Sequence, residues 1–342
     1  MTQYTLYPWQ EGAWQQLMHD PARLPHALLL TGEPGIGKRR FAERLAAWYL
    51  CEHPDKRLAP CGECDGCRWQ AAGNHPDFRI LAPSDPVDEE LEDTTKPKRK
   101  QPIIGVEDIR DLTDFVNLSS HRNGAKVTLV YPAEAMNTAA ANAFLKTLEE
   151  PPAGAQFILV THQARRLLPT IRSRCRVLAL TTPDTAAATT WLEEQGVRDA
   201  AVHLAHAGGS PLAAQEDAQA EWLPLRASVL DQISAPQHLN VLGLAAEIEK
   251  AKIEPARVIE WLQKWTHDLI TLGMSGRIRY YPDRTDALTK LAPRASRMLV
   301  YVDRLQQAQR LAHHPLNARL VFESLLFDYL AALRGKLTGN LP

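Results

Sequence analysis

The chain has 342 residues, of which 45% are hydrophobic and 23% are charged. At roughly 100–200 residues per domain, this length predicts two or three domains with cores of their own. Its 39 basic and 40 acidic residues give a net charge of −1, which disfavours a free-standing DNA-binding protein because such proteins usually carry a basic excess. No stretch approaches the roughly 18 apolar residues of a membrane span, and residues 1–16 lack the basic and apolar parts of a secretory signal. We therefore expect a cytoplasmic protein with reduced cysteines and no membrane partner.

The first half of the chain alternates short apolar runs with stretches of helical periodicity. The apolar runs are residues 26–31, 78–81, 127–131 and 157–161. Continuous apolar runs are typical of strands that are buried on both faces of a parallel sheet. A Gly-rich turn leads into a predicted helix at 39–50, and a second helix at 138–148 ends before Pro151. The pattern predicts a doubly wound α/β domain over residues 1–180.

The strand signal fades after about residue 180. Short helices are expected at 185–195, 200–207 and 211–218. From residue 222 onward the pattern is helical throughout, and Pro255 is well placed at the start of one helix. We therefore expect a small helical domain over residues 181–221 and a larger one over residues 222–342.

Two segments in the chain are expected to separate structured elements. Residues 85–100 carry a run of acidic residues, then a run of basic ones, and almost nothing apolar, which predicts a solvated, mobile loop. A regulatory or nucleic-acid role for its basic end is the alternative. Near the end of the chain, His314-Pro315 is expected to separate two helices.

A phosphate-binding loop is predicted at Gly32–Arg39, whose sequence is GEPGIGKR. The segment lies between a predicted strand and a predicted helix, which is the context that such a loop needs. Gly32, Gly35 and Gly37 allow backbone N–H groups to turn toward an anion, and the helix N-terminus adds partial positive charge. Lys38 can reach the β- and γ-phosphates. The alternative is a Gly-rich turn that binds no ligand.

Both groups that would hold Mg²⁺ are missing from this loop. Arg39 stands where a Ser or Thr hydroxyl is expected, and Tyr131-Pro132 follow the strand at 127–130 where an acidic pair is expected. Glu134 is near, but it is displaced past the proline. Without the metal, charge on a transferring phosphoryl group is poorly stabilised. We therefore expect a phosphate-binding fold that does not hydrolyse nucleotide and does not bind it tightly.

Four of the five cysteines are clustered in the sequence. Cys51, Cys61, Cys64 and Cys67 supply enough thiolates for a closed tetrahedral zinc site. Because no ligand position is left for water, the zinc is expected to be structural rather than catalytic. The alternatives are four free thiols and a zinc-dependent nucleic-acid-binding module. Acidic residues around the cluster offset the basic ones, which disfavours the second alternative.

Three arginines lie close together at Ile171–Arg176, whose sequence is IRSRCR, just before the strand-like residues 177–180. On composition alone the segment is interpreted as a solvated basic turn. The alternative is an arginine that stabilises transition-state charge in the active site of a neighbouring subunit.

Several motifs together resemble the AAA+ clamp-loader subunits of bacterial DNA polymerase III. They are GEPGIGK at 32–38, the four-cysteine cluster, CRWQAAGNHPD at 67–77, GAKV at 124–127, NAFLKTLEEPP at 142–152 and SRC at 173–175. The resemblance covers nearly the whole chain and is strongest through about residue 180; LKTLEEPP and SRC are its most specific parts. It implies an α/β AAA+ domain with a zinc module at about 51–67, a helical lid domain and an all-α collar domain for oligomerisation.

Within that family the chain is most similar to the δ′ subunits. The ATPase subunits carry the two groups that Arg39 and Tyr131-Pro132 replace here, and an arginine shortly after a Gly-Ser pair. Here Gly209-Ser210 is followed by Pro211-Leu212-Ala213. The departures imply a subunit without ATPase activity of its own. An active AAA+ ATPase is the alternative that they argue against.

The resemblance also implies a site residue and a set of partners. The Ser-Arg-Cys motif places a trans-acting arginine finger at Arg174. The implied partners are the γ/τ and δ subunits in a pentamer, with the β sliding clamp and primed DNA reached through that complex. Structural zinc is the one cofactor expected.

Overall fold

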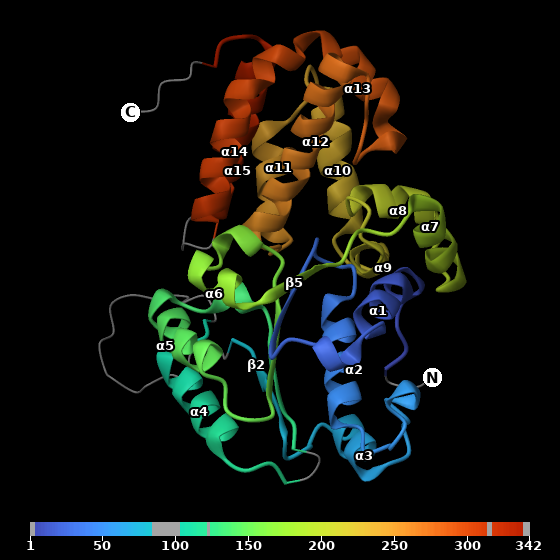
Figure 1. Ribbon diagram of the computed structural model, residues 1–342. Coiled ribbons are helices and arrows are strands. Elements are labelled where there is room, and N and C mark those ends of the chain that lie inside the picture. The colour runs from blue at the N-terminus through green and yellow to red at the C-terminus, as the bar shows by residue number, and fades with distance from the viewer. Residues whose placement is uncertain (1–3, 84–102, 122–123, 313–316, 338–342) are drawn as a thin grey trace. The chain divides into compact units, whose positions relative to one another are not determined.

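The computed structural model describes residues 4–83, 103–121, 124–312 and 317–337 (Figure 1). The predicted charged loop at 85–100 and the predicted His314-Pro315 junction lie outside these residues. The chain divides into two compact units, one ending at Asp184 and one beginning at Thr185. Within the described residues, we find no helix with the length and apolar character needed to cross a lipid bilayer.

The first unit is built on a parallel sheet of five strands. These are β1 (Ala27–Thr31), β2 (Phe78–Leu81), β3 (Lys126–Val130), β4 (Ala155–Val160) and β5 (Arg176–Ala179), in the order β2-β3-β4-β1-β5. Every pairing is parallel, and the register sets Leu29 of β1 opposite Leu159 of β4 and Val177 of β5. The three central strands are almost fully buried. This burial on both faces explains why their sequences are mostly apolar.

Helices cover both faces of this sheet (Figure 1). The helices of the unit are α1 (Glu11–Met18), α2 (Lys38–Leu50), α3 (Asp65–Ala71), α4 (Val106–Asn117), α5 (Thr138–Glu149) and α6 (Pro169–Arg174). Leu28 and Leu30 of β1 share a core with α2, whereas Leu29 between them shares a core with α4 and α5. Alternate side chains of one strand thus serve opposite layers. The predicted doubly wound α/β fold is confirmed.

The second unit is entirely helical in the residues described. Its helices are α7 (Thr185–Glu194), α8 (Ala200–His206), α9 (Pro211–Ala218), α10 (Leu223–Ser234), α11 (Val241–Lys250), α12 (Pro255–Ser275), α13 (Thr285–Leu291), α14 (Leu299–Leu311) and α15 (Ala318–Leu333). The three predicted short helices are therefore present, and α12 begins at Pro255 as expected. The boundary at residues 221 and 222 stays a prediction.

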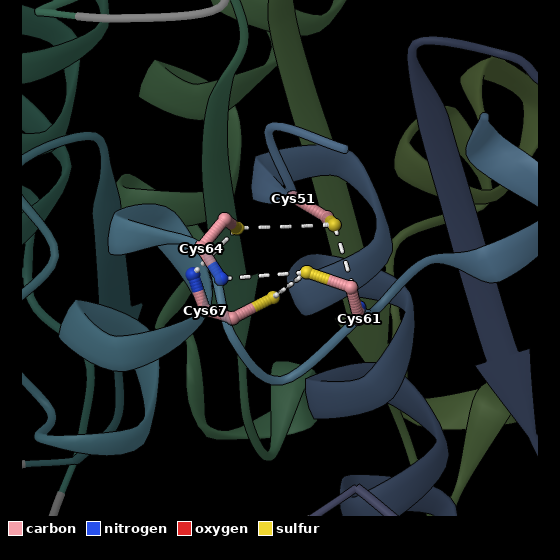
Figure 2. A group of neighbouring side chains, drawn as sticks. All are labelled: Cys51, Cys61, Cys64 and Cys67. Carbon is pink, nitrogen blue, oxygen red and sulfur yellow. Dashed lines mark hydrogen bonds between the residues drawn. The ribbon is translucent and has the colours of Figure 1, made fainter. Parts of the chain in front are cut away.

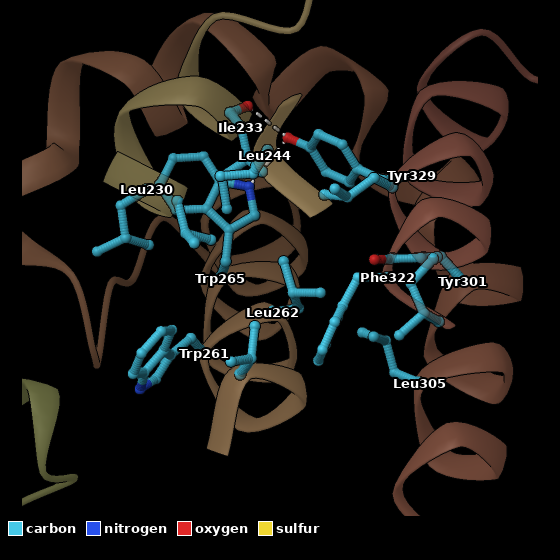
Figure 3. Close-up of a cluster of buried hydrophobic side chains, with 14 of the residues drawn as sticks. Leu230, Ile233, Leu244, Trp261, Leu262, Trp265, Tyr301, Leu305, Phe322 and Tyr329 are labelled. Carbon is cyan, nitrogen blue, oxygen red and sulfur yellow. Dashed lines mark hydrogen bonds between the residues drawn. The ribbon is translucent and has the colours of Figure 1, made fainter. Parts of the chain in front are cut away.

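Two apolar cores lie within the second unit. Helices α7 to α9 share a small core that includes Leu192 and Leu204. The later helices share a much larger one, part of which Figure 3 shows. In that core the indole Nε1 of Trp265 donates to the Tyr329 hydroxyl at 3.0 Å, and this hydroxyl donates to the carbonyl of Ile233 at 2.9 Å. One buried chain of hydrogen bonds therefore joins α12, α15 and α10, and it gives the polar groups of Trp265 and Tyr329 partners inside the core.

Candidate functional site

The Gly-rich loop lies between β1 and the first turn of α2. Gly35 and Gly37 have φ values of 74° and 84°, a left-handed conformation that favours glycine. Lys38 is only 2% exposed, and its Nζ donates to the carbonyls of Gly32 at 2.7 Å and Glu33 at 2.5 Å. Burial lowers the pKa of Lys38 to about 8, against the opposing effect of the Glu134 and Glu33 carboxylates. The lysine is thus bonded to the loop's own backbone.

A short N-terminal segment, Tyr7–Gln10, packs on this loop. Trp9 Nε1 donates to the Ile36 carbonyl at 3.0 Å, and Gln10 Nε2 donates to the Gly37 carbonyl at 2.8 Å. A Cβ on Gly37 would lie 2.5 Å from the Tyr7 ring, so this close approach needs a glycine. The sequence carries no signal for this contact, because phosphate-loop motifs do not include residues before the strand.

The two residues that replace the expected Mg²⁺-holding groups lie against each other. The Arg39 guanidinium lies over the Tyr131 ring, 5.5 Å from its centroid, and Arg39 Nε donates to Glu43 Oε1 at 2.9 Å. Neither Arg39 nor Tyr131 offers a carboxylate or an aliphatic hydroxyl. The two positions that ordinarily supply the metal's ligands therefore carry a permanently charged guanidinium and an aromatic ring instead.

Glu134 and His162 complete this end of the sheet. Glu134 Oε1 accepts a hydrogen bond from the backbone N–H of His162 at 2.9 Å. Its other carboxylate oxygen and His162 Nδ1 are buried and have no hydrogen-bond partner among the described residues. Burial and the nearby Lys38 ammonium lower the pKa of His162, although Glu134 opposes this shift. His162 was not singled out from the sequence, since one histidine after a buried strand carries no motif.

The four clustered cysteines converge in the structure (Figure 2). Their sulfurs all lie within 4.8 Å of one another, with 3.9 Å between Cys61 and Cys67 and 4.0 Å between Cys64 and Cys51. A tetrahedral site with Zn–S bonds of about 2.3 Å has sulfurs about 3.8 Å apart, so the arrangement fits. These four cysteines can hold a metal ion such as zinc.

Local backbone geometry builds this cluster. Cys51 directly follows α2, and Cys67 lies in the first turn of α3. A Cβ on Gly66 would lie 2.4 Å from the Leu50 carbonyl oxygen, so glycine lets α3 approach the end of α2. Backbone N–H groups donate to the sulfurs of Cys51, Cys61 and Cys64 at 3.3–3.4 Å. Such bonds favour the thiolate, which is the form that binds metal.

Arg174 is the last residue of α6, and its side chain is 32% exposed. Its Nη1 donates to the Thr170 carbonyl at 2.9 Å, and its Nη2 forms an ion pair with Glu149 at the end of α5. Ile171 and Cys175, on either side of it, are buried and anchor the helix to the core. The predicted finger residue is therefore held at the surface by a fixed scaffold.

The chain is similar in sequence to known subunits of DNA polymerase III. Residues 9–184 match the family model described as DNA polymerase III, delta subunit. The chain is 36% identical to the DNA polymerase III subunit delta′ of Pseudomonas aeruginosa, over 96% of this chain and 98% of the relative, and 32% identical to that of Yersinia pestis, over 98% of each. A DNA polymerase III subunit tau from Salmonella typhimurium is 37% identical over 45% of this chain and 21% of its own length.

A solved structure is also similar over nearly the whole length. It is a DNA polymerase III gamma subunit-related protein from Thermotoga maritima, with 18% identity and a TM-score of 0.45 over 95% of this chain and all of the other. The similarity to the two delta′ relatives extends over nearly the full length of both chains. The chain therefore belongs to the DNA polymerase III delta′ subunits of the clamp-loader family.

Proposed function

We propose that this chain is a non-catalytic clamp-loader subunit that activates a neighbouring ATPase subunit in trans. It supplies Arg174 to the neighbour's ATP and thereby helps a complex with γ/τ and δ subunits place the β sliding clamp on primed DNA. The observation that carries the proposal is the Arg39 guanidinium over the Tyr131 ring, 5.5 Å from its centroid. A subunit with this arrangement lacks metal-assisted phosphoryl transfer at its own loop, so its contribution is made elsewhere.

The state of Lys38 supports the same proposal. In a working phosphate loop this lysine reaches the β- and γ-phosphates. Here it is buried and donates to two loop carbonyls, which satisfies its ammonium without a ligand. Residues Trp9 and Gln10 also bond to the loop backbone. A bound nucleotide would therefore have to replace the hydrogen bonds between Lys38 and the loop carbonyls. It would gain no Mg²⁺ ion bridging its phosphates to the protein.

Arg174 has the properties that a trans-acting arginine needs. Its guanidinium is planar, permanently charged and able to bond two phosphate oxygens at once. It is partly exposed, at the end of a helix anchored by buried neighbours. Removing an arginine finger typically lowers the rate by about 10³–10⁵-fold at the site that it serves. A loader has several ATP sites, so the loss measured on the whole complex is expected to be smaller.

Reconstitution of the complex tests this proposal. Arg174→Ala is expected to assemble and bind ATP normally but to hydrolyse ATP and load clamps poorly. Arg172→Ala and Arg176→Ala are the matched controls, because they remove the same charge from exposed flanking positions. Unimpaired loading by Arg174→Ala, or equal losses for all three variants, would contradict the finger assignment. Phosphate release by the isolated wild-type chain would contradict the non-catalytic assignment.

The cysteine cluster has a structural role in this proposal, with zinc as its metal. Four sulfur ligands complete the tetrahedron, so no position is left for a reactive water. The metal would fasten the loop after α2 to the start of α3. The helices beyond residue 222, which have a large core of their own, would serve as the collar of the pentamer, and residues 181–221 as the lid.

A further inference from the structure

We propose that Glu149 is a positioning residue for Arg174: its carboxylate fixes the guanidinium at the end of α6 so that the fork is already oriented when a neighbour's phosphate arrives. The inference deepens the proposed trans role of Arg174 and rests on it. Glu149 itself would contact no nucleotide and would act only through the arginine.

Two anchors hold the arginine on different sides. Nη1 donates to the Thr170 carbonyl at 2.9 Å, one turn earlier in the same helix. Nη2 pairs with Oε1 of Glu149, the last residue of α5, and α5 and α6 pack against each other. The first anchor is local to α6, whereas the second comes from another element. Together they fix both the position and the plane of the guanidinium.

The benefit of this pair lies in orientation rather than in stability. An ion pair whose side chains are 32% and 48% exposed contributes little to folding stability, because water screens the two charges. A free arginine at a surface samples many rotamers, and ordering it costs side-chain conformational entropy. A donor that is already ordered needs no reorganisation when charge develops on the phosphate. The pair is therefore expected to affect the rate of ATP hydrolysis more than the stability of the chain.

The opposite role for Glu149 would be to mask the charge of Arg174. The two roles differ in what a glutamine does at this position. Glutamine keeps an oxygen that accepts from Nη2 but removes the negative charge. Positioning predicts that Glu149→Gln behaves like the wild type, whereas masking predicts that Glu149→Gln and Glu149→Ala both activate.

Single-turnover ATP hydrolysis by the reconstituted complex separates these outcomes. We expect Glu149→Ala to slow the Arg174-dependent phase by about tenfold, since small misplacements of a catalytic group have effects of this order or larger. Glu149→Gln should stay within about twofold of the wild type. Glu150→Ala is the matched control, because it removes the adjacent carboxylate and should leave the rate unchanged. In an Arg174→Ala background, Glu149→Ala should cause no further loss.

The failure of this inference differs from the failure of the proposed function. If Arg174→Ala slows the complex but Glu149→Ala does not, Glu149 is not a positioning residue and the finger assignment stands. Faster hydrolysis by both Glu149 variants would replace positioning with masking. If Arg174→Ala has no effect, the finger assignment itself is wrong.

A measurement on the isolated chain tests the ordering without any partner. NMR relaxation of the Arg174 side-chain N–H groups should show an ordered guanidinium in the wild type and in Glu149→Gln. Glu149→Ala should be more mobile, with unchanged backbone spectra away from α5 and α6. Equal mobility in the wild type and Glu149→Ala would overturn the inference.

Discussion

Helix α2 has a candidate site at each of its ends, and the two differ in completeness. At its N-terminus the phosphate loop keeps its glycines and Lys38, but the metal-holding positions carry Arg39 and Tyr131. At its C-terminus all four cysteines are present and their sulfurs lie within 4.8 Å of one another. The backbone of a phosphate loop can thus be present without the side chains that usually hold its metal, whereas a closed metal site needs every ligand. The two sites are therefore distinguished by the side chains that they contain, more than by the conformation of their backbones.

The largest effect is expected at the cysteine end. Cys64→Ser should remove the bound zinc and lower the free energy of unfolding by roughly 2–5 kcal/mol, because metal binding contributes directly to folding. Denaturant unfolding and elemental analysis measure both, with about one zinc expected per wild-type chain.

Cys175→Ser is the control for this change, since Cys175 is buried but lies outside the cluster. It should keep the wild-type zinc content whatever it does to stability. If freshly purified, reduced wild-type protein contained no zinc, the cysteine cluster would not be a complete metal site. The contrast between the two ends of α2 would then be wrong.

A smaller effect is expected from the titration of Lys38. Its pKa is about 8 in the folded chain and about 10.4 in an unfolded one, so above pH 8 the unfolded state binds more protons. The free energy of unfolding of the wild type, relative to Lys38→Met, should therefore rise between about pH 8 and 10, by about 1–3 kcal/mol. Urea unfolding of both proteins at pH 7 and pH 9.5 measures the difference. A constant difference would mean that the lysine is not held in its buried position.

A still smaller effect is expected from Lys38→Ala in the assembled loader. Because the loop is not the site of hydrolysis, ATP turnover should change by less than about twofold. If this variant abolished loader activity and left assembly intact, Lys38 would be required for loading, and the loop could not be called non-catalytic.

No effect on phosphate or nucleotide binding is expected when Mg²⁺ is removed from the solution. Arg39 repels Mg²⁺ but can itself pair with a phosphate, so any residual affinity for phosphate or nucleotide should be insensitive to EDTA. Calorimetric titrations with Mg²⁺ and with EDTA measure this on the isolated chain. Tighter binding with Mg²⁺ would show that another residue holds the metal.

Much of the fold was predictable because the central strands are buried on both faces. Continuous apolar runs at β1, β3 and β4 and the proline after α5 mark those elements in the sequence. Helix α4 was missed, although Ile109, Leu112, Phe115 and Val116 have helical spacing and are buried. That spacing is the signal by which it could have been found. Its N-terminus is closed by the Asp108 carboxylate, which accepts from the N–H of Gly105 at 2.7 Å.

The sequence by itself determined which chemical groups are present at each site. The cysteines lie close together along the chain, so one local loop can bring them to a metal, and the identities of Arg39 and Tyr131 exclude the usual ligands. The tertiary structure alone decided that Arg39 lies over Tyr131, that Trp9 and Gln10 bond to the loop, and that Glu149 pairs with Arg174. Each of these contacts joins elements far apart in the sequence. Their geometry depends on how helices and strands pack, which no local pattern encodes.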